Sequence, residues 1–557
     1  MSEGRLRRTN EEQTTEMPSF VMLDDGTGKL TKGLYFLMRT ELPPETAGGP
    51  NRPAPDRVQL AVVPFSLGQA SDGSVIATAD ASKSFFATNN DGNEYRNANL
   101  PQAFALTKDI ACVNYNYQQN GTNDTKRYTQ CFTADGTRVL NQSLIMANTN
   151  DDCSQHASGD EGQVTQRVGD KVYFVMWAGC NGNGDDAGFV NFLEYDVSNP
   201  TAVTVKRQFN ALVAEREERT RGNCSIAAKD PNTAICTWSE GNNQPTMDGT
   251  WMAAIDITPG KFSGTKQQGA IIWKEMVDGR KDKDGIRTYS MRAHHVRIQA
   301  PNAQGALENT DMMLWYSNDL QGNNANDGRK GGTVRATQMG IIKADREGMS
   351  FVMPLRDTSQ LIRGTGGSHL GMTGAVFGTT DKLLPGAMFT VGSFTGGYFS
   401  GQARSLVWDQ AAGTFKDGGM IPTAENDAHL YSNYLGNNPG NQGRNFDDGQ
   451  MISNPFLGVN GNTDAYLMVY ASTGKPMSEV GVPEKKPSAF LTVIPLASAP
   501  APVDTGSGSG SSGSGSDEGS NGDNGGAESL GGCSAGGTSG LATLFLIGLA
   551  AFIRRRR

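Results

Sequence analysis

Short apolar runs, each rich in aromatic and β-branched residues, recur along most of the chain at fairly even intervals. Runs of this length and composition predict β-strands rather than helices. The starts of successive runs are 76, 62, 62, 78, 75 and 78 residues apart. The seven runs are Leu34–Met38, Ile110–Tyr117, Val172–Trp177, Ala234–Trp238, Met312–Tyr316, Ala387–Val391 and Ala465–Tyr470.

Each run has further strand-like segments around it. One precedes it, one follows it after a Gly- and Asn-rich loop, and a third then returns. Five of the segments that follow end at or just before an Asp and a turn, which is a hairpin signal. The pattern therefore predicts about four antiparallel strands in every repeat.

Four-stranded units repeated around an axis predict a β-propeller, because each unit buries its faces only against its neighbours. We expect an all-β fold with about seven blades over residues 17–498, after a disordered segment at 1–16. The last repeat stops after its second strand, so we expect Ser19–Leu23 to supply a missing strand and close the ring. A pair of β-sandwich domains is the alternative fold.

Composition narrows the classes of partner. The chain has 70 Gly among 557 residues, 37% hydrophobic residues and a net charge of −9. Nucleic-acid binding needs a basic face, so no nucleic acid is expected as a partner.

Six cysteines fall within one stretch of the repeat region, and their gaps suggest successive pairs. An even number without CxxC spacing predicts disulfides in an oxidising compartment rather than a zinc site. Other connectivities stay open. The suggested pairs are Cys112 with Cys131, Cys153 with Cys180, and Cys224 with Cys236.

Two sets of residues are candidate metal ligands. One loop alternates Asx with Gly, which suits Ca²⁺, although such loops also form plain hairpin turns. Its candidate ligands are Asn181, Asn183, Asp185 and Asp186. Histidines that lie in or just before the apolar runs are the second set. If those runs are the first strands of the blades and line the central channel, these histidines would meet at one mouth of it, with Asp160 or Glu161 nearby. Backbone-bonded loop histidines are the alternative. The candidate ligands of this set are His294, His295 and His369.

No catalytic motif is evident in the sequence. There is no G-x-S-x-G, no P-loop and no HExxH, so no catalytic residue is assigned, and possible Ca²⁺ is the one cofactor considered.

The C-terminal region has a different character from the repeats. Residues 499–532 form a Gly/Ser-rich stretch that predicts a disordered linker. Residues 533–557 contain Cys533 and an apolar segment at 541–553. As a helix, that segment would be about 20 Å long, short of the ~30 Å hydrocarbon core. The terminal Arg554, Arg555, Arg556 and Arg557 would stay in the cytoplasm by the positive-inside rule.

The linker, Gly-Cys, short apolar helix and Arg cluster together resemble the MYXO-CTERM sorting tail of myxobacterial surface proteins. The resemblance covers about residues 531–557. It implies processing at Cys533 by a C-terminal sorting protease, membrane contact through the tail, and display at the outer surface. An ordinary transmembrane tail anchor is the alternative.

The N-terminus does not match this destination. Met1–Met17 has no apolar core, so it is not a signal peptide, and we expect one upstream of this start or in a longer chain. A cytoplasmic protein with a chance tail is the competing interpretation.

Two function hypotheses follow. The leading one is a surface-anchored binding or adhesion propeller that recognises a glycan, a matrix polymer or a partner protein, without catalytic activity. The alternative is a secreted hydrolase or lyase that acts on polysaccharide, which predicts carboxylates, His and Arg clustered at the channel mouth.

The sorting hypothesis predicts that Cys533→Ala abolishes processing of the tail and lowers the amount of protein at the cell surface. Surface labelling and the mass of the mature chain measure both effects. Normal processing and normal display of the variant would show the hypothesis to be wrong.

Overall fold

The structure is a computed structural model of the whole chain. Its described side chains lie between Ser19 and Val352, with gaps. Its backbone is described at residues 2–6, 13–24, 31–41, 57–69, 71, 75–87, 96–118, 125–146, 156–181, 187–214, 222–240, 249–278, 289–301, 307–321, 333–357, 370–373, 375–376, 387–395, 398–409, 414–420, 429–432, 450–452, 465–472 and 488–495.

The described elements are strands, apart from two single-turn 3-10 segments at Ala81–Lys83 and Gln268–Ala270. They form seven successive antiparallel units of four strands. Blades 1 to 3 are β2 (Gln13–Leu23), β3 (Lys32–Glu41), β4 (Arg57–Gln69), β5 (Val75–Ala79); β7 (Arg96–Ala105), β8 (Ile110–Gln118), β9 (Thr125–Thr133), β10 (Arg138–Met146); and β11 (His156–Val168), β12 (Lys171–Asn181), β13 (Ala187–Asp196), β14 (Thr204–Ala214).

The remaining blades repeat this order. Blades 4 to 6 are β15 (Gly222–Ala227), β16 (Asp230–Glu240), β17 (Gly249–Asp256), β18 (Ile271–Asp278); β19 (Tyr289–Pro301), β20 (Leu307–Gln321), β21 (Thr333–Ala344), β22 (Met349–Asp357); and β23 (Leu370–Thr373), β25 (Ala387–Thr395), β26 (Tyr398–Asp409), β27 (Thr414–Met420). Blade 7 is β29 (Gln450–Ile452), β30 (Ala465–Ser472), β31 (Ser488–Pro495) and β1 (Ser2–Leu6). Three short strands are added, β6 (Phe85–Phe86) on β4, β24 (Ala375–Val376) on β19 and β28 (His429–Ser432) on β26.

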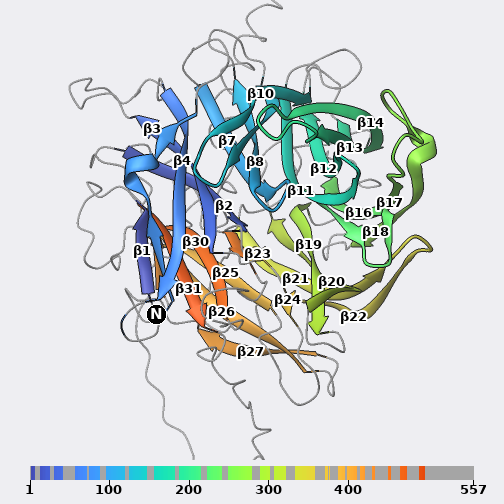
Figure 1. Cartoon of the computed structure of the whole chain (residues 1–557). Coiled ribbons are helices and arrows are strands. Elements are labelled where there is room, and N and C mark those ends of the chain that lie inside the picture. The colour runs from blue at the N-terminus through green and yellow to red at the C-terminus, as the bar shows by residue number, and fades with distance from the viewer. Residues whose placement is uncertain are drawn as a thin grey trace, which may run out of the picture.

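The seven blades follow one another around a common centre, so the fold is a β-propeller, as the repeat pattern predicted (Figure 1). The chain enters each blade at its innermost strand. The innermost strands β11 and β15 of neighbouring blades touch as a short parallel pair, and the added strand β24 pairs in parallel with β19.

The apolar runs that define the repeat are the second strands of the blades, not the first. A second strand has a hydrogen-bonded partner on each side and a packed blade against each face, which explains why it is the most hydrophobic strand. In β12, for example, the seven residues from Val172 to Ala178 are all buried. The innermost strands are the less apolar segments that precede these runs.

The N-terminus closes the ring, but with a different segment from the one predicted. β1 (Ser2–Leu6) pairs with β31 and completes blade 7 as its outermost strand. Ser19–Leu23 instead belongs to β2, the innermost strand of blade 1. The segment 1–16, which we expected to be disordered, therefore contains β1 and the start of β2.

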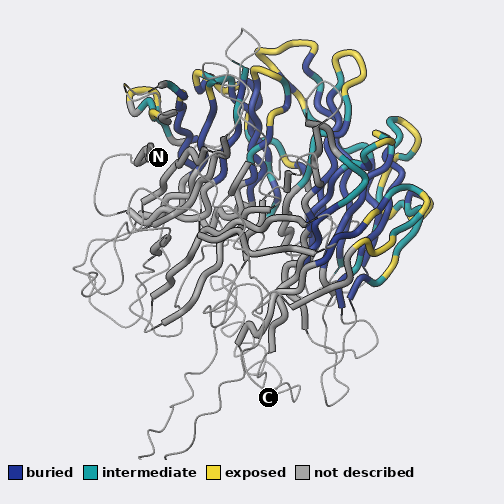
Figure 2. Tube along the Cα trace, turned by 90° about the horizontal axis from the view of Figure 1, so that it is seen from below, coloured by how far each residue is buried: buried dark blue, intermediate teal, exposed yellow. Residues whose placement is uncertain are grey.

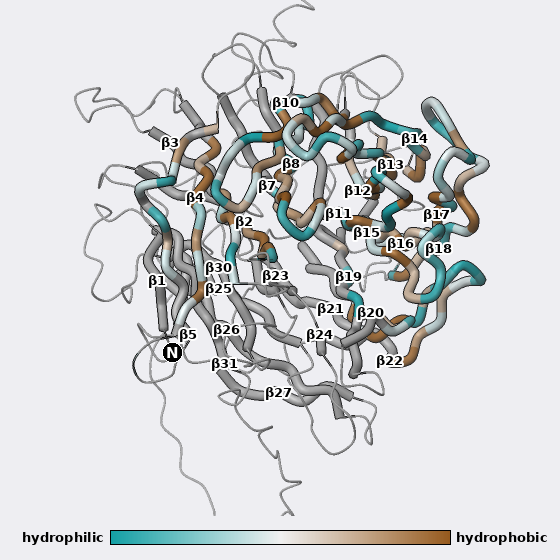
Figure 3. Tube along the Cα trace, in the orientation of Figure 1, coloured by the Kyte–Doolittle hydropathy of each residue, from teal (hydrophilic) through white to brown (hydrophobic). Residues whose placement is uncertain are grey.

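The hydrophobic core is divided into layers between successive blades. The described part of the chain has four large clusters, between blades 1 and 2, 2 and 3, 3 and 4, and 4 and 5. Between blades 2 and 3, the rings of Phe104 and Phe174 stack with centroids 4.1 Å apart. Buried residues follow the strands and exposed residues lie mostly at the turns (Figure 2), and hydrophobic stretches mark the same strands (Figure 3).

A second kind of contact joins the innermost strands. In each case a polar side chain of one blade bonds a backbone group of the next blade. The four bonds are Ala103 N–H to Ser19 Oγ (2.7 Å), Gln102 Nε2 to Gly162 O (3.0 Å), Ile226 N–H to Gln163 Oε1 (3.0 Å) and Asn223 Nδ2 to His295 O (2.7 Å). An innermost strand is a sheet edge, so these side chains satisfy backbone groups that have no strand partner there.

Two of the three suggested disulfides are confirmed. Cys112–Cys131 joins β8 to β9, and Cys224–Cys236 joins β15 to β16, with Cα atoms 4.0 and 4.1 Å apart. Both lie between directly opposite residues of adjacent antiparallel strands. Cys180 is near the end of β12, and Cys153 lies outside the described residues.

Within the described residues, no helix has the length and apolarity needed to cross a membrane. The linker at 499–532 and the tail at 533–557 lie outside those residues.

Removal of the Cys224–Cys236 bond should destabilise the propeller, because the bond restricts the unfolded chain and both cysteines are buried. We expect the double variant Cys224→Ala/Cys236→Ala to lose about 2–4 kcal/mol of unfolding free energy. Urea unfolding of the oxidised protein measures this loss, with Cys533→Ala as the control. Equal midpoints for the double variant and the control would contradict the prediction.

Candidate functional site

The two ends of the ring differ in the length of their connections. At one end, which we call the turn end, first strands turn into second strands and third strands into fourth. Most of the turns there are short, as in residues 169–170 and 345–348, although the β17–β18 connection at 257–270 is longer. The other end, which we call the start end, is where the innermost strands begin. Its connections are longer, as in residues 42–56 and 322–332.

Aspartates shape the turn end. In four blades, the Asp that ends or follows the third strand accepts a hydrogen bond from the backbone N–H two residues later, an Asx-turn. The Oδ1···N distances for Asp135, Asp196, Asp256 and Asp345 are 3.2, 3.0, 3.1 and 3.0 Å. The Asp turn signal noted in the sequence therefore marks the corner between the third and fourth strands.

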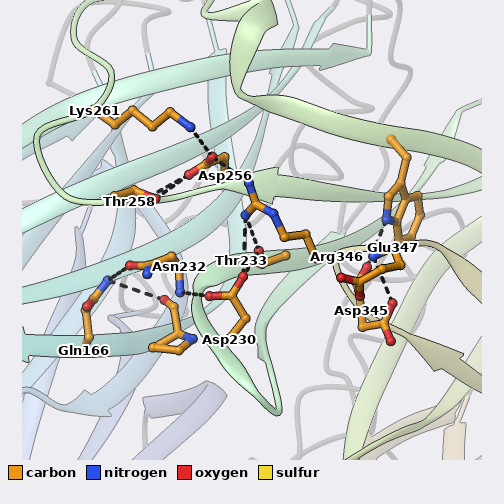
Figure 4. Close-up of polar contacts among 12 residues, drawn as sticks. Gln166, Asp230, Asn232, Thr233, Asp256, Thr258, Lys261, Asp345, Arg346 and Glu347 are labelled. Carbon is orange, nitrogen blue, oxygen red and sulfur yellow. Dashed lines mark hydrogen bonds and ion pairs between the residues drawn. The ribbon is translucent and has the colours of Figure 1, made fainter.

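One of these corners also joins two blades (Figure 4). Arg346, in the β21–β22 turn of blade 5, reaches blade 4. Its Nη2 lies 3.0 Å from Asp256 Oδ2, and its Nη1 lies 2.9 Å from Thr233 Oγ1. Lys261 Nζ bonds the same oxygen of Asp256 at 2.7 Å.

Asp256 is 3% exposed and stays ionised in this cluster. Burial opposes its ionisation, but hydrogen bonds from Lys261, Thr258 and Arg346 outweigh burial and hold the pKa of Asp256 well below its usual range. Because its partners already use the carboxylate, the cluster connects blades 4 and 5 rather than offering a reactive group.

The start end has a different composition. The first halves of the innermost strands carry many of the groups that acid–base chemistry uses. These residues are Glu16 on β2, Arg96 on β7, His156, Asp160 and Glu161 on β11, and Arg292 and His294 on β19. The strand order brings them to one end of the ring axis, and the Glu161 backbone is paired with Asn223 of β15.

A buried polar network lies just beside this end, between blades 4 and 5. His295 of β19 is 2% exposed. Its Nε2 lies 2.8 Å from Ser225 Oγ and its Nδ1 lies 2.7 Å from Thr237 Oγ1. The backbone N–H of His295 also bonds Asn223 Oδ1 at 3.1 Å. Both ring nitrogens are thus occupied by hydroxyl groups, so this imidazole has no nitrogen left for a metal ion.

Arg297, two residues further along β19, completes the network. Its Nη2 donates to Ser225 Oγ at 3.2 Å, and its Nη1 donates to Asp311 O at 3.3 Å. Burial lowers the pKa of Arg297 to about 10, against the opposing effect of Asp311 and Asp345. The guanidinium remains charged at neutral pH, and it links both blades from inside their interface.

Of the other predicted metal ligands, two belong to described strands. His294 is a residue of β19, and Asn181 is the last residue of β12. Asn183, Asp185, Asp186 and His369 lie outside the described residues. Among the residues that are described, no three His, Cys, Asp or Glu side chains are placed to hold a metal ion.

The sequence indicated Asp160 and Glu161 near one mouth of the channel, but it did not single out Asn223 or Arg297. The available signal was their position: each lies in the segment that directly precedes an apolar run, which is the innermost strand.

No protein-family model and no curated protein sequence matches the chain. Among solved structures, an α-L-arabinofuranosidase from Fusarium graminearum is 11% identical, with a TM-score of 0.36, over 73% of this chain and 95% of that chain. A Penicillium chrysogenum α-L-arabinanase bound to arabinobiose is also 11% identical, with a TM-score of 0.36, over 72% and 95%. A polysaccharide lyase, an ulvan lyase, is 9% identical, with a TM-score of 0.37, over 87% and 94%.

These findings correct the leading function hypothesis. The solved structures that the chain is similar to are glycoside hydrolases and a polysaccharide lyase, whereas we had predicted a binding or adhesion module. We therefore abandon the adhesion hypothesis. The likeness is too distant to carry an activity over to this chain, so the function must be argued from its own residues.

The contacts of Arg346 with Asp256 lead us to expect a particular change of stability with pH. The folded pKa of Asp256 lies below its unfolded value of about 3.9, so its stabilisation is complete above that value and is lost progressively as the pH falls from there through the folded pKa. Arg346→Ala should cost about 1 kcal/mol at neutral pH, since the guanidinium is partly exposed.

The same variant should also lose less stability on acidification than the wild-type protein, because the pKa of Asp256 moves back toward its ordinary value. Urea unfolding at about pH 7 and about pH 3 measures both effects. Identical acid losses in the two proteins would show that Arg346 does not hold Asp256 ionised.

Proposed function

We propose that this protein is a polysaccharide-active enzyme, a hydrolase or a lyase, whose active site is at the start end of the ring. The observation that carries the proposal is the gathering of carboxylate, imidazole and guanidinium residues on the innermost strands at that end. The alternative hypothesis from the sequence required this combination at the channel mouth.

The residues present suit the cleavage of a glycosidic bond. A hydrolase needs two carboxyl groups, one as general acid and one as nucleophile or general base. Asp160 and Glu161 on β11 and Glu16 on β2 supply carboxylates from two blades. We assign Glu161 as the first candidate, because its strand position is paired with the innermost strand of the next blade.

A lyase would use the same end differently. It removes a proton next to a uronate carboxylate and expels the glycosidic oxygen, so it needs a base and a positive charge near the uronate. His294 and Arg292 on β19 and Arg96 on β7 provide these types of group. Hydrolysis and elimination give different products, so one assay distinguishes them.

The proposed place of action is outside the cell. The two disulfides agree with an oxidising compartment. The tail at 533–557, with Cys533 as its processing point, would keep the enzyme at the outer surface at the end of a flexible linker. A tethered enzyme of this kind would act on polymers too large to enter the cell.

Glu161→Gln and His294→Gln test the proposed site. The purified chain should degrade at least one member of a panel that includes arabinans and uronate-containing polysaccharides. Loss of a general acid, base or nucleophile should lower kcat/KM roughly 100-fold or more. New reducing ends without ultraviolet absorbance indicate hydrolysis, and an absorbing unsaturated sugar indicates elimination.

The matched control is Glu275→Gln, which makes the same change at an exposed position on the outermost strand β18. Its activity should equal that of the wild-type protein. Full activity in both site variants would show that the reaction does not take place at the start end. No turnover of any polysaccharide by the wild-type protein would overturn the enzyme proposal.

A further inference from the structure

Asn223 is connected to both neighbouring blades near the start end of the ring. Its side-chain amide meets the backbone of His295 twice, with Nδ2 donating to the carbonyl oxygen at 2.7 Å and Oδ1 accepting from the N–H at 3.1 Å. Its own backbone is the parallel partner of Glu161 on β11. One residue of blade 4 thus touches β19 of blade 5 and β11 of blade 3.

We infer that Asn223 is a positioning residue that sets the placement of His294 relative to Glu161. His294 directly precedes His295 on β19, so fixing the backbone of His295 also fixes the strand position of His294. The inference rests on the proposed function, since it assigns to those two residues the chemistry of the site.

The surroundings of Asn223 support a rigid role. It is 6% exposed, and the next residue, Cys224, is bonded to Cys236 of β16. The disulfide holds β15 in its own blade. Ser225, on the other side of Cys224, binds the imidazole of His295 and the guanidinium of Arg297. β15 is therefore tied to its own blade through Cys224 and to blade 5 through Asn223 and Ser225.

The amide is suited to this role for a chemical reason. An Asn side chain carries a donor and an acceptor in one plane, as a peptide group does, so it can replace the strand partner that the edge of β19 lacks. Alanine provides neither group. Aspartate keeps the shape and the acceptor but has no N–H to offer the carbonyl oxygen of His295.

The expected effect is kinetic rather than only structural. A displacement of about 1 Å between reacting groups can cost roughly 100-fold in rate. Asn223→Ala should therefore lower kcat by about 10- to 100-fold with little change in KM, and Asn223→Asp should have a smaller effect in the same direction.

The matched control is Arg346→Ala. It removes a contact between the same two blades, but at the turn end. It should lower thermal stability while leaving kcat within about 2-fold of the wild-type value. The comparison is made well below the melting temperature of each variant, and Asn223→Asp takes the place of Asn223→Ala if the latter does not fold.

A second readout does not depend on activity. In histidine-labelled protein, the NMR resonances of the His294 ring, assigned through His294→Gln, should move in Asn223→Ala and stay in place in Arg346→Ala. If these resonances behave as expected but no polysaccharide is degraded, the positioning role stands and the proposed function fails. Unchanged His294 resonances, or an unchanged kcat in a folded Asn223 variant, would overturn the inference.

Discussion

The propeller depends on hydrogen bonds to the backbone groups at the inner edge of each blade. An innermost strand has a hydrogen-bonded partner on one side only, and buried backbone groups without partners are costly. Four described interfaces meet this need in the same way, with a side chain of one blade bonding the backbone of the next. Ser19, Gln102, Gln163 and Asn223 play this part in blades 1 to 4. The bonds fix the height of each strand relative to its neighbour.

The hydrophobic layers and the polar bonds have separate tasks. Layers such as the one around Trp177 and Trp238 supply most of the burial between blades, but hydrophobic contact is not directional. Hydrogen bonds are directional, so they select one register among many that would bury the same area. An enzyme site shared by several blades needs this second property, because its residues come from different strands.

The carboxylates at the turn end stabilise the fold, whereas those at the start end belong to the proposed active site. At the turn end, carboxylates such as Asp256 accept hydrogen bonds from the backbone of their own turn and from cationic side chains of the next blade. At the start end, Asp160, Glu161 and His294 are residues of the innermost strands, and the backbones of Glu161 and His295 are both joined to Asn223. The side chain of Asn223 thus supports the backbone of the strand that carries His294.

The sequence by itself determined the all-β class and the corner aspartates, and it suggested about seven repeats and three cysteine pairs, two of which are present, because these features follow from local spacing and turn chemistry. It did not show that β1 closes blade 7, that the apolar runs are second strands, or that His295 is enclosed by Ser225 and Thr237. Those features join residues about 60 to 490 positions apart. Only ring closure decides which strand is innermost, so only the tertiary structure could bring Glu161, Asn223 and His294 to one end of the axis.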